Sequence, residues 1–232
     1  MAKKSPIKPI PHEEMLQRYA RLYSGVIYDT MDKLGLPNQV LAHEIKPLSR
    51  GLKMAGLALT LQSVDHVPGS VKGAKDYFRA LCRACTPGCV AVYSLGKENW
   101  AGHWGELTST SVKAHGCQGV VLDGGARDSD LLEAMGFKVF CRFTSPIEMA
   151  KRACFIACQQ PVQMPGSLTA TVIVRPNDWV FADGDGVTII PQEVATEVLV
   201  KAEVLFEREK KGRELFATGM DPVKVIRKYN VG

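Results

Sequence analysis

The amino-acid sequence predicts a mixed α/β fold, and three features carry that prediction. Residues 119–123 form a short apolar run, followed by a glycine-rich turn at 124–126 and by a helical pattern that Gly136 closes. This order of patterns is typical of a buried strand that leads into a helix. Strand and helix patterns also alternate before this unit, whereas short strands and then one long helix follow from residue 168 onward. Such alternation favours helices packed on a largely parallel sheet.

The composition is typical of an ordinary globular protein. The chain has 232 residues, of which 46% are hydrophobic and 23% charged, so we expect a single domain over residues 1–232. Within it, we expect a flexible arm at 1–11 and a helical arm at 193–232 that packs on a neighbouring subunit. The net charge of +5 suits anionic substrates as well as nucleic acid and does not decide between them.

Two further features bear on the cellular compartment. No apolar run is long enough to span a bilayer, and the lysine-rich start lacks the apolar segment of a signal peptide. The seven cysteines are an odd number in otherwise apolar segments, so we expect reduced thiols. We therefore predict a cytoplasmic protein and expect neither a membrane nor a nucleic-acid partner.

The spacing of apolar residues predicts the elements of the first half. Residues 12–23 and 24–35 have helical periodicity, and Ser24 is placed as the N-cap of the second helix. The other expected elements are a loop at 45–50, a strand at 56–64, a helix at 75–85, a strand at 89–95, an irregular polar segment at 96–104 and a helix at 105–115.

The second half is expected to contain more strands. After the strand at 119–123 comes a helix whose apolar stripe is Leu131, Leu132 and Met135. The other expected elements are a strand at 138–143, a loop region at 146–165, strands at 169–174, 179–182 and 187–190, and helices at 193–216 and 221–229. Residues 183–186, Asp-Gly-Asp-Gly, are interpreted as a hairpin turn, because the downstream glutamate of a calcium loop is missing.

Cys82, Cys85 and Cys89 have a spacing that resembles a metal site. The first two fall on an apolar helix, and no second cysteine pair or histidine pair completes a ligand set. We therefore interpret the three thiols as small hydrophobic core groups.

Arg127 and Asp128 lie side by side just after the buried strand and its turn. In open α/β sheets ligands bind at the carboxyl ends of the strands, so Asp128 could hold a hard cation and Arg127 a carboxylate or keto oxygen. The structural alternative makes Asp128 a helix N-cap and pairs Arg127 with Asp123 or Asp130. The local pattern leaves both interpretations open.

A second candidate site lies at the predicted helix that begins at Gly105. The N–H groups of Glu106, Leu107 and Thr108 have no intrahelical acceptor there and carry the positive end of the helix dipole, which suits a carboxylate. Glu106 itself has a structural interpretation as a favourable first-turn acid.

Trp-Gly-Glu-Leu at 104–107 and Asp-Gly-Gly-Ala-Arg-Asp at 123–128 resemble motifs of a known family. It is the 4-hydroxy-4-methyl-2-oxoglutarate aldolase/oxaloacetate decarboxylase family, which also contains the regulators of ribonuclease activity A. The resemblance covers most of the chain, including residues 24–29 and 180–187. It implies a compact α/β/β/α sandwich of the ribonuclease-regulator A type that assembles as trimers or hexamers.

The resemblance also implies roles for individual residues. Backbone amides of Gly105, Glu106, Leu107 and Thr108 would hold the substrate carboxylate. Arg127 would contact the carboxylate and the keto oxygen. Asp128 would be the single direct protein ligand of a magnesium or manganese ion.

Glu106 would also help to hold the water that removes a proton from the substrate. A further acid would come from the C-terminal helix of a neighbouring subunit, for which Glu203 is the best match and Glu207 and Glu209 are alternatives. Cys89 stands where the family usually has an aspartate, which bears on the identity of the substrate.

These roles imply a metal-dependent lyase that cleaves a 4-hydroxy-2-oxo acid to pyruvate through an enolate and also decarboxylates oxaloacetate. The alternative is a non-catalytic protein that regulates a ribonuclease or another partner. Arg127, Asp128 and Glu106 favour the enzyme, because a docking protein has no need of an acid beside a carboxylate-binding site. No glycine-rich site for a methyl donor supports a third label used in this family, methyltransferase.

Overall fold

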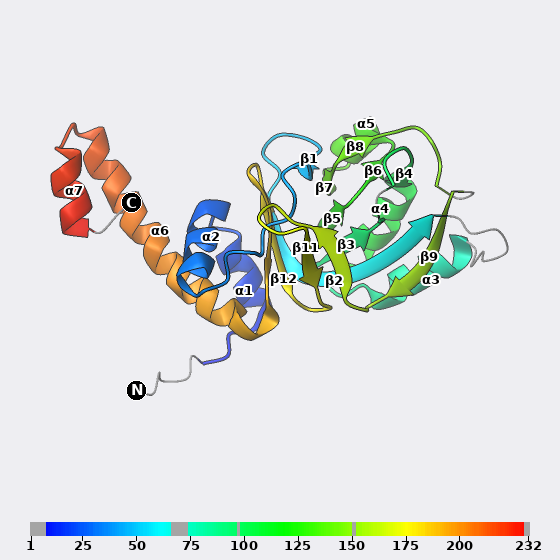
Figure 1. The fold of residues 1–232 in the computed structure, drawn as a ribbon, viewed down its shortest axis with the longest axis horizontal. Coiled ribbons are helices and arrows are strands. Elements are labelled where there is room, and N and C mark those ends of the chain that lie inside the picture. The colour runs from blue at the N-terminus through cyan, green and yellow to red at the C-terminus, as the bar shows by residue number, and fades with distance from the viewer. Residues whose placement is uncertain (1–7, 66–73, 97, 150–151, 230–232) are drawn as a thin grey trace.

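The computed structural model describes residues 8–65, 74–96, 98–149 and 152–229 (Figure 1). Within these ranges, an eight-stranded sheet comprises β1 (Lys46–Pro47), β2 (Met54–Asp65), β3 (Cys89–Ser94), β5 (Gly119–Leu122), β7 (Lys138–Cys141), β9 (Ala153–Cys158), β12 (Trp179–Asp183) and β13 (Gly186–Ile190). The strand order is β1-β7-β5-β3-β2-β12-β13, and β9 pairs with β2 beside this path. Because β2, β3, β5 and β7 run parallel and the others antiparallel, the expected mixed α/β fold is confirmed.

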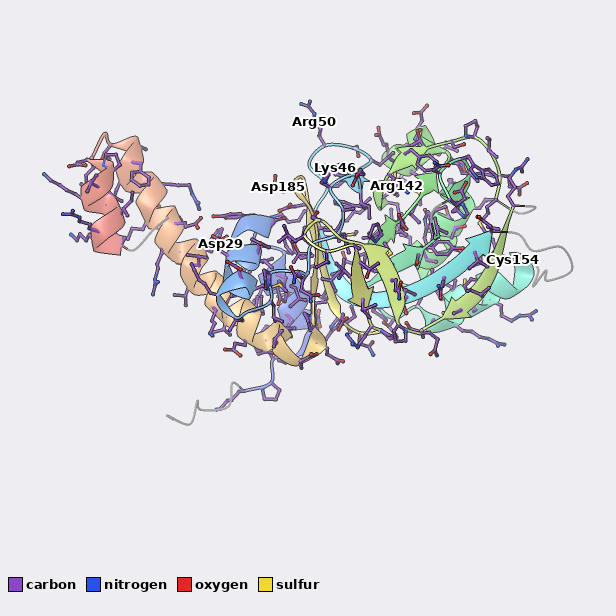
Figure 2. All side chains as sticks on the ribbon, in the orientation of Figure 1. Asp29, Lys46, Arg50, Arg142, Cys154 and Asp185 are labelled. Carbon is purple, nitrogen blue, oxygen red and sulfur yellow. The ribbon has the colours of Figure 1, made fainter. Side chains whose placement is uncertain are left out.

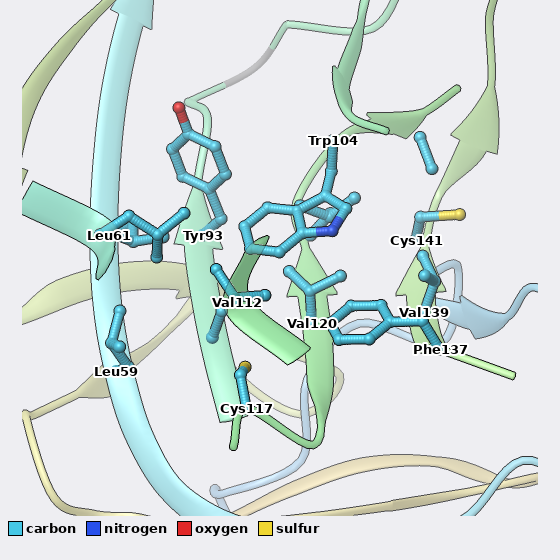
Figure 3. Close-up of a cluster of buried hydrophobic side chains, with 14 of the residues drawn as sticks. Leu59, Leu61, Tyr93, Trp104, Val112, Cys117, Val120, Phe137, Val139 and Cys141 are labelled. Atoms are coloured by element: carbon cyan, nitrogen blue, oxygen red, sulfur yellow. The ribbon is translucent and has the colours of Figure 1, made fainter. Parts of the chain in front are cut away.

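One helix connects each neighbouring pair of the parallel strands. These helices are α3 (Ala74–Ala84), α4 (Glu106–Ala114) and α5 (Ser129–Ala134). They enclose an apolar cluster in which the ring of Trp104 stacks on that of Phe137, with 6.2 Å between centroids (Figure 3). The predicted stripe of α5 is partly wrong, because this short helix turns Leu132 to the core while Leu131 is 56% exposed.

A second β layer and a second group of helices complete the fold. They are β10 (Val162–Pro165), β11 (Thr171–Val174), α1 (His12–Tyr19), α2 (Ser24–Lys33) and α6 (Ala195–Ala217). The β10–β11 hairpin covers one face of the sheet through Val162 and Val174, whereas α1, α2 and α6 pack on Trp179 and Phe181. Figure 1 shows the two helix groups at opposite ends of the twisted sheet, as the α/β/β/α arrangement requires.

Each of the strands β3, β5 and β7 is followed, after a break, by another short strand. These are β4 (Gly102–Trp104), β6 (Gly125–Ala126) and β8 (Phe143–Thr144), which form a separate parallel sheet. The turn predicted at 124–126 and the irregular segment predicted at 96–104 are therefore partly wrong. Part of each segment is a strand, because β4 and β6 pair with each other although they are distant in the sequence. The Arg127 amide donates to the Trp104 carbonyl at 2.8 Å, which brings the residues after β4 and β6 together.

Two other local predictions fail because their partners are distant in the sequence. Tyr23, not Ser24, holds the N-cap position of α2, and the Ser24 amide and hydroxyl both donate to the buried carboxylate of Asp183, the amide at 2.9 Å. The loop region predicted at 146–165 contains β9 and β10, because β9 pairs with the distal half of β2 and β10 with β11.

The C-terminal helices extend away from the sheet (Figure 1). The first half of α6 buries Ala195, Val198, Leu199 and Ala202, whereas Gly212 is the one buried residue of its second half, near α7 (Pro222–Tyr229). Because the second half of α6 buries so little, it agrees with the expected helical arm. The contact of this arm with a neighbouring subunit stays a prediction. Of the expected N-terminal arm, residues 1–7 lie outside the described residues.

The cysteines of the described residues form no disulfide with one another. Cys89 is buried, Cys82 and Cys85 are partly buried, and no cluster of three or more potential ligands in the described ranges could hold a metal ion. The burial of Cys89 and the partial burial of Cys82 and Cys85 agree with the interpretation of these thiols as core groups. None of the described helices combines the length and the apolar character needed to cross a bilayer.

We predict that Asp183→Ala lowers the free energy of unfolding by about 3 kcal/mol, because it leaves the buried Ser24 amide and hydroxyl without their charged acceptor. Chemical denaturation of both proteins measures the difference. Asp185→Ala is the matched control, since Asp185 is exposed in the same turn and Lys46 contacts its backbone oxygen at 3.1 Å (Figure 2). Equal stability of the wild type and Asp183→Ala would contradict the role of this contact.

Candidate functional site

Asp128 is held against the first turn of α4. Its Oδ2 accepts the Glu106 amide at 3.1 Å and lies 3.4 Å from Arg127 Nε. Asp128 has the left-handed φ of 59° and occupies the N-cap position of α5, but its side chain makes no capping hydrogen bond. The carboxylate therefore contacts the start of α4 instead of capping its own helix, so the predicted N-cap role of Asp128 on α5 is wrong.

Gly105 makes this approach possible. A Cβ atom on Gly105 would lie 2.5 Å from Asp128 Oδ2 and 3.0 Å from Arg127 Cγ, so any other residue would displace the carboxylate. Gly105 is also the N-cap of α4, and its carbonyl accepts the Ser109 amide at 3.1 Å. The helix therefore begins where the sequence predicts, and the amides of Leu107 and Thr108 have no acceptor within it.

A cavity of about 180 Å³ opens beside this contact. Gly105, Leu107, Thr108, Arg127 and Asp128 line it together, so the structure brings most of the predicted site residues to one place. The Arg127 and Asp128 side chains are about one-third exposed, which leaves both accessible to a small ligand.

The acids predicted to serve as bases lie elsewhere. The Glu106 side chain accepts a hydrogen bond from the Thr110 hydroxyl at 2.6 Å, along α4, and does not line the cavity. Glu203 accepts two hydrogen bonds from Arg18, at 2.8 and 2.5 Å, where α6 packs on α1. Figure 1 shows α1 and α6 at the opposite end of the molecule from α4, so Glu203 does not reach the cavity of its own chain.

Glu98, which the sequence did not single out, pairs with His103 of the polar segment and orders the residues before β4. Glu98 accepts the amides of Trp100 and Ala101 at 2.7 and 2.6 Å and is 2.8 Å from His103 Nε2. Burial lowers the pKa of His103, against the opposing effect of Glu98. In the described residues His103 Nδ1 and Tyr77 Oη have no hydrogen-bond partner. His103 and Tyr77 both line the cavity. In the sequence, the polar residues of segment 96–104 were the signal that could have identified Glu98.

Asp123, considered as a partner of Arg127, pairs instead with Arg142, with 3.5 Å between Nη1 and Oδ1. Burial raises the pKa of Asp123 to about 6 despite this arginine. Asp123 and Arg142 line a separate cavity of about 340 Å³. The ion pair therefore leaves Arg127 free of Asp123.

The donor set at Asp128 fits a hard divalent cation that takes few ligands from the protein. Its carboxylate is partly exposed in the cavity, and Oδ2 uses one amide and one guanidinium contact. Because the described residues contain no group of three potential ligands, water and substrate oxygens would complete the shell, as magnesium prefers.

The chain is similar to proteins of one family. Residues 25–189 match the family model described as RraA-like, Aldolase/RraA. A Halalkalibacterium halodurans protein named "Putative 4-hydroxy-4-methyl-2-oxoglutarate aldolase" is 30% identical over 190 residues, 82% of each chain. Protein DlpA of Legionella pneumophila is 27% identical over 207 residues, 88% of this chain, and the chain spans 32% of its length.

Among solved structures, RraAS2 of Streptomyces coelicolor, described as an unusual member of the RNase ES inhibitor RraA family, superposes with a TM-score of 0.77. Its sequence is 25% identical, and the match covers 88% of this chain and 99% of that one. The resemblance first seen in the two motifs is thereby confirmed over most of the sequence. The chain belongs to the RraA-like Aldolase/RraA family.

Proposed function

We propose that this protein is a divalent-metal-dependent lyase that cleaves a 4-hydroxy-2-oxo acid, of the 4-hydroxy-4-methyl-2-oxoglutarate type, to release pyruvate, and that it also decarboxylates oxaloacetate. The observation that carries this proposal is the contact of Asp128 with the start of α4, 3.1 Å from the Glu106 amide and beside Arg127. Membership of a family that includes aldolases supports it.

Each group around the cavity has a role in binding the 2-oxo acid. The amides of Leu107 and Thr108 bind the carboxylate at the positive end of α4, and Arg127 holds the carboxylate and keto oxygen by charge-assisted hydrogen bonds. Asp128 holds a magnesium or manganese ion, which when bound supplies Lewis-acid stabilisation of negative charge.

Cleavage of the C3–C4 bond leaves its electron pair on the pyruvate fragment as an enolate. The Arg127 guanidinium stabilises this charge as it develops, and such preorganised electrostatic stabilisation is usually the largest catalytic contribution. Oxaloacetate gives the same enolate when carbon dioxide leaves, and that reaction needs no base. One set of residues can therefore serve both reactions.

Aldol cleavage also needs a base for the C4 hydroxyl proton. We assign it to a water held by Glu106, which must release Thr110 to do so, and by an acid on α6 of a neighbouring subunit. Glu203 is paired with Arg18 and Glu209 contacts Tyr23 and Arg213, whereas Glu207 is exposed and has no such partner in the described chain. This assignment requires a neighbouring subunit, which the trimer or hexamer expected for the family would supply, and we place this assembly in the cytoplasm.

A second candidate function is a binding protein that regulates a ribonuclease, which the likeness to RraAS2 supports. Docking alone does not explain why Gly105 leaves room for a carboxylate at a helix start. We therefore favour the enzyme.

We predict that Asp128→Ala lowers metal-dependent pyruvate release from oxaloacetate by at least about a hundredfold, because the one protein ligand of the cation is lost. Coupled assay of pyruvate with magnesium and then with excess chelator measures this, and circular dichroism checks the fold. Asp130→Ala, an exposed acid on the same helix, should keep wild-type activity. Turnover that survives in Asp128→Ala would show that the metal assignment is wrong.

Arg127→Ala should lower both aldol cleavage and decarboxylation by at least about a hundredfold, since the same enolate charge loses its guanidinium in each. Steady-state kinetics with 4-hydroxy-4-methyl-2-oxoglutarate and with oxaloacetate tests this. Arg50→Ala serves as the control, because Arg50 extends from a loop into solvent (Figure 2). Loss of only one reaction would contradict a shared enolate.

Glu106→Gln should reduce aldol cleavage at least about tenfold more than decarboxylation, because only aldol cleavage needs a base. Glutamine retains an acceptor for the Thr110 hydroxyl, so α4 should stay intact. The ratio of the two kcat values reports the effect independently of protein concentration. An equal loss in both reactions would remove Glu106 from the base's role.

A further inference from the structure

The cavity beside Asp128 has two chemically different walls. The polar wall consists of the α4 start with Arg127 and Asp128, described above. The second wall is largely apolar and comprises Phe78, Met149 and Phe155 with Tyr77, whose buried hydroxyl has no hydrogen-bond partner in the described residues. Its aromatic rings form one surface, since the Tyr77 ring meets Phe155 edge-on at 5.2 Å and Phe78 at 5.6 Å between centroids.

The charges on this second wall do not favour a second anion. Arg127 is the one arginine or lysine among the described residues that line the cavity, and it lies on the polar wall. Glu148, which bridges to Gly102, adds a carboxylate of its own. His103 is buried, and the burial that lowers its pKa favours the neutral ring. Among the described lining residues, a distal carboxylate would therefore meet the like charge of Glu148 and largely apolar surface.

On the basis of the proposed lyase activity, we propose that the substrate is a monocarboxylate, a 4-hydroxy-2-oxo acid whose C4 carries a hydrocarbon group where 4-hydroxy-4-methyl-2-oxoglutarate carries its second carboxylate. The apolar group packs on the Tyr77–Phe155 surface while the 2-oxo acid end lies at Arg127 and Asp128. The cavity of about 180 Å³ includes the space beside Arg127 and Asp128, so the hydrocarbon group must be small; for comparison, an apolar cavity of about 150 Å³ holds benzene.

The reaction balances without another reactant. The C3–C4 bond breaks and its electrons pass to the pyruvate enolate, which takes a proton at C3 to become pyruvate. The C4 hydroxyl loses its proton to the base as C4 becomes a carbonyl. The second product is therefore an aldehyde or ketone that carries the hydrocarbon group.

The first test compares kcat/KM of the full-length protein with magnesium for 4-hydroxy-2-oxohexanoate, 4-hydroxy-2-oxo-4-phenylbutanoate and 4-hydroxy-4-methyl-2-oxoglutarate. We expect at least one of the two monocarboxylates to exceed the dicarboxylate by about tenfold or more, the scale on which apolar pockets discriminate. The two monocarboxylates also distinguish an alkyl from an aromatic group. A dicarboxylate that is cleaved as fast as, or faster than, both monocarboxylates would overturn the proposal.

Metal-dependent exchange of the pyruvate methyl protons in deuterium oxide, followed by proton NMR, tests the lyase activity separately from the monocarboxylate substrate. Pyruvate has no distal group, so exchange tests the enolate site alone. Exchange combined with a preference for the dicarboxylate would refute the monocarboxylate substrate and leave the lyase standing. Absence of exchange and of all cleavage would refute the lyase and this inference with it.

Binding of acids that cannot be cleaved gives a readout besides activity. Calorimetric titration with magnesium present should give a Kd for 2-oxohexanoate or 2-oxo-4-phenylbutanoate about tenfold lower than for 2-oxoglutarate. Glu148→Gln should lower the ratio of the Kd for 2-oxoglutarate to the Kd for the monocarboxylate by about threefold, because a charge of the same sign as the distal carboxylate is removed. Glu133→Gln, at an exposed position on α5, is the matched control and should leave this ratio unchanged. An equal ratio in both variants would contradict the role of Glu148.

Discussion

The close approach of the Asp128 carboxylate to the start of α4 is the constraint on which the rest of the site depends. An α-helix exposes unsatisfied N–H groups at its first turn, and Asp128 uses one of them while the others remain available. The approach is sterically allowed because residue 105 is glycine. It also requires Asp128 to adopt a left-handed φ, a conformation that aspartate tolerates better than most residues. Backbone strain of this kind tends to be concentrated at functional sites.

The small parallel sheet of β4, β6 and β8 makes this contact rigid. It joins the three segments that leave the carboxyl ends of β3, β5 and β7, so the residues after each short strand are fixed relative to one another. The Glu98 carboxylate adds to this order by holding two amides of the segment that leads into β4. Arg127 and Gly105 are therefore positioned by backbone pairing instead of by flexible loops, which is how precise binding sites are usually built.

The acids on α6 bear on the proposal that a neighbouring subunit completes the site. Glu203, the acid that the family motif suggests, is paired with Arg18 of its own chain, far from Asp128 along the molecule. The second half of α6 has little packing within the chain. On the proposed arrangement, in which the outer half of α6 contacts a neighbouring subunit, the exposed Glu207 is the one of the three candidate acids that the described residues of its own chain do not engage.

Sequence by itself determined the α/β class, the helix start at Gly105, the pairing of Arg127 with Asp128 in one motif and the thiol character of the cysteines, because these depend on local periodicity and local chemistry. It did not determine the partner of Ser24, the strands within 146–165 or the pairing of Gly125 and Ala126. Those features depend on hydrogen bonds between segments far apart in the chain, and the local spacing of residues carries no information about such bonds. The shared position of Tyr77 and Phe155 was hidden for the same reason. In the sequence Tyr77 is an ordinary core position and Phe155 falls in a predicted loop region, and only the tertiary structure brings both to the cavity that Asp128 also lines.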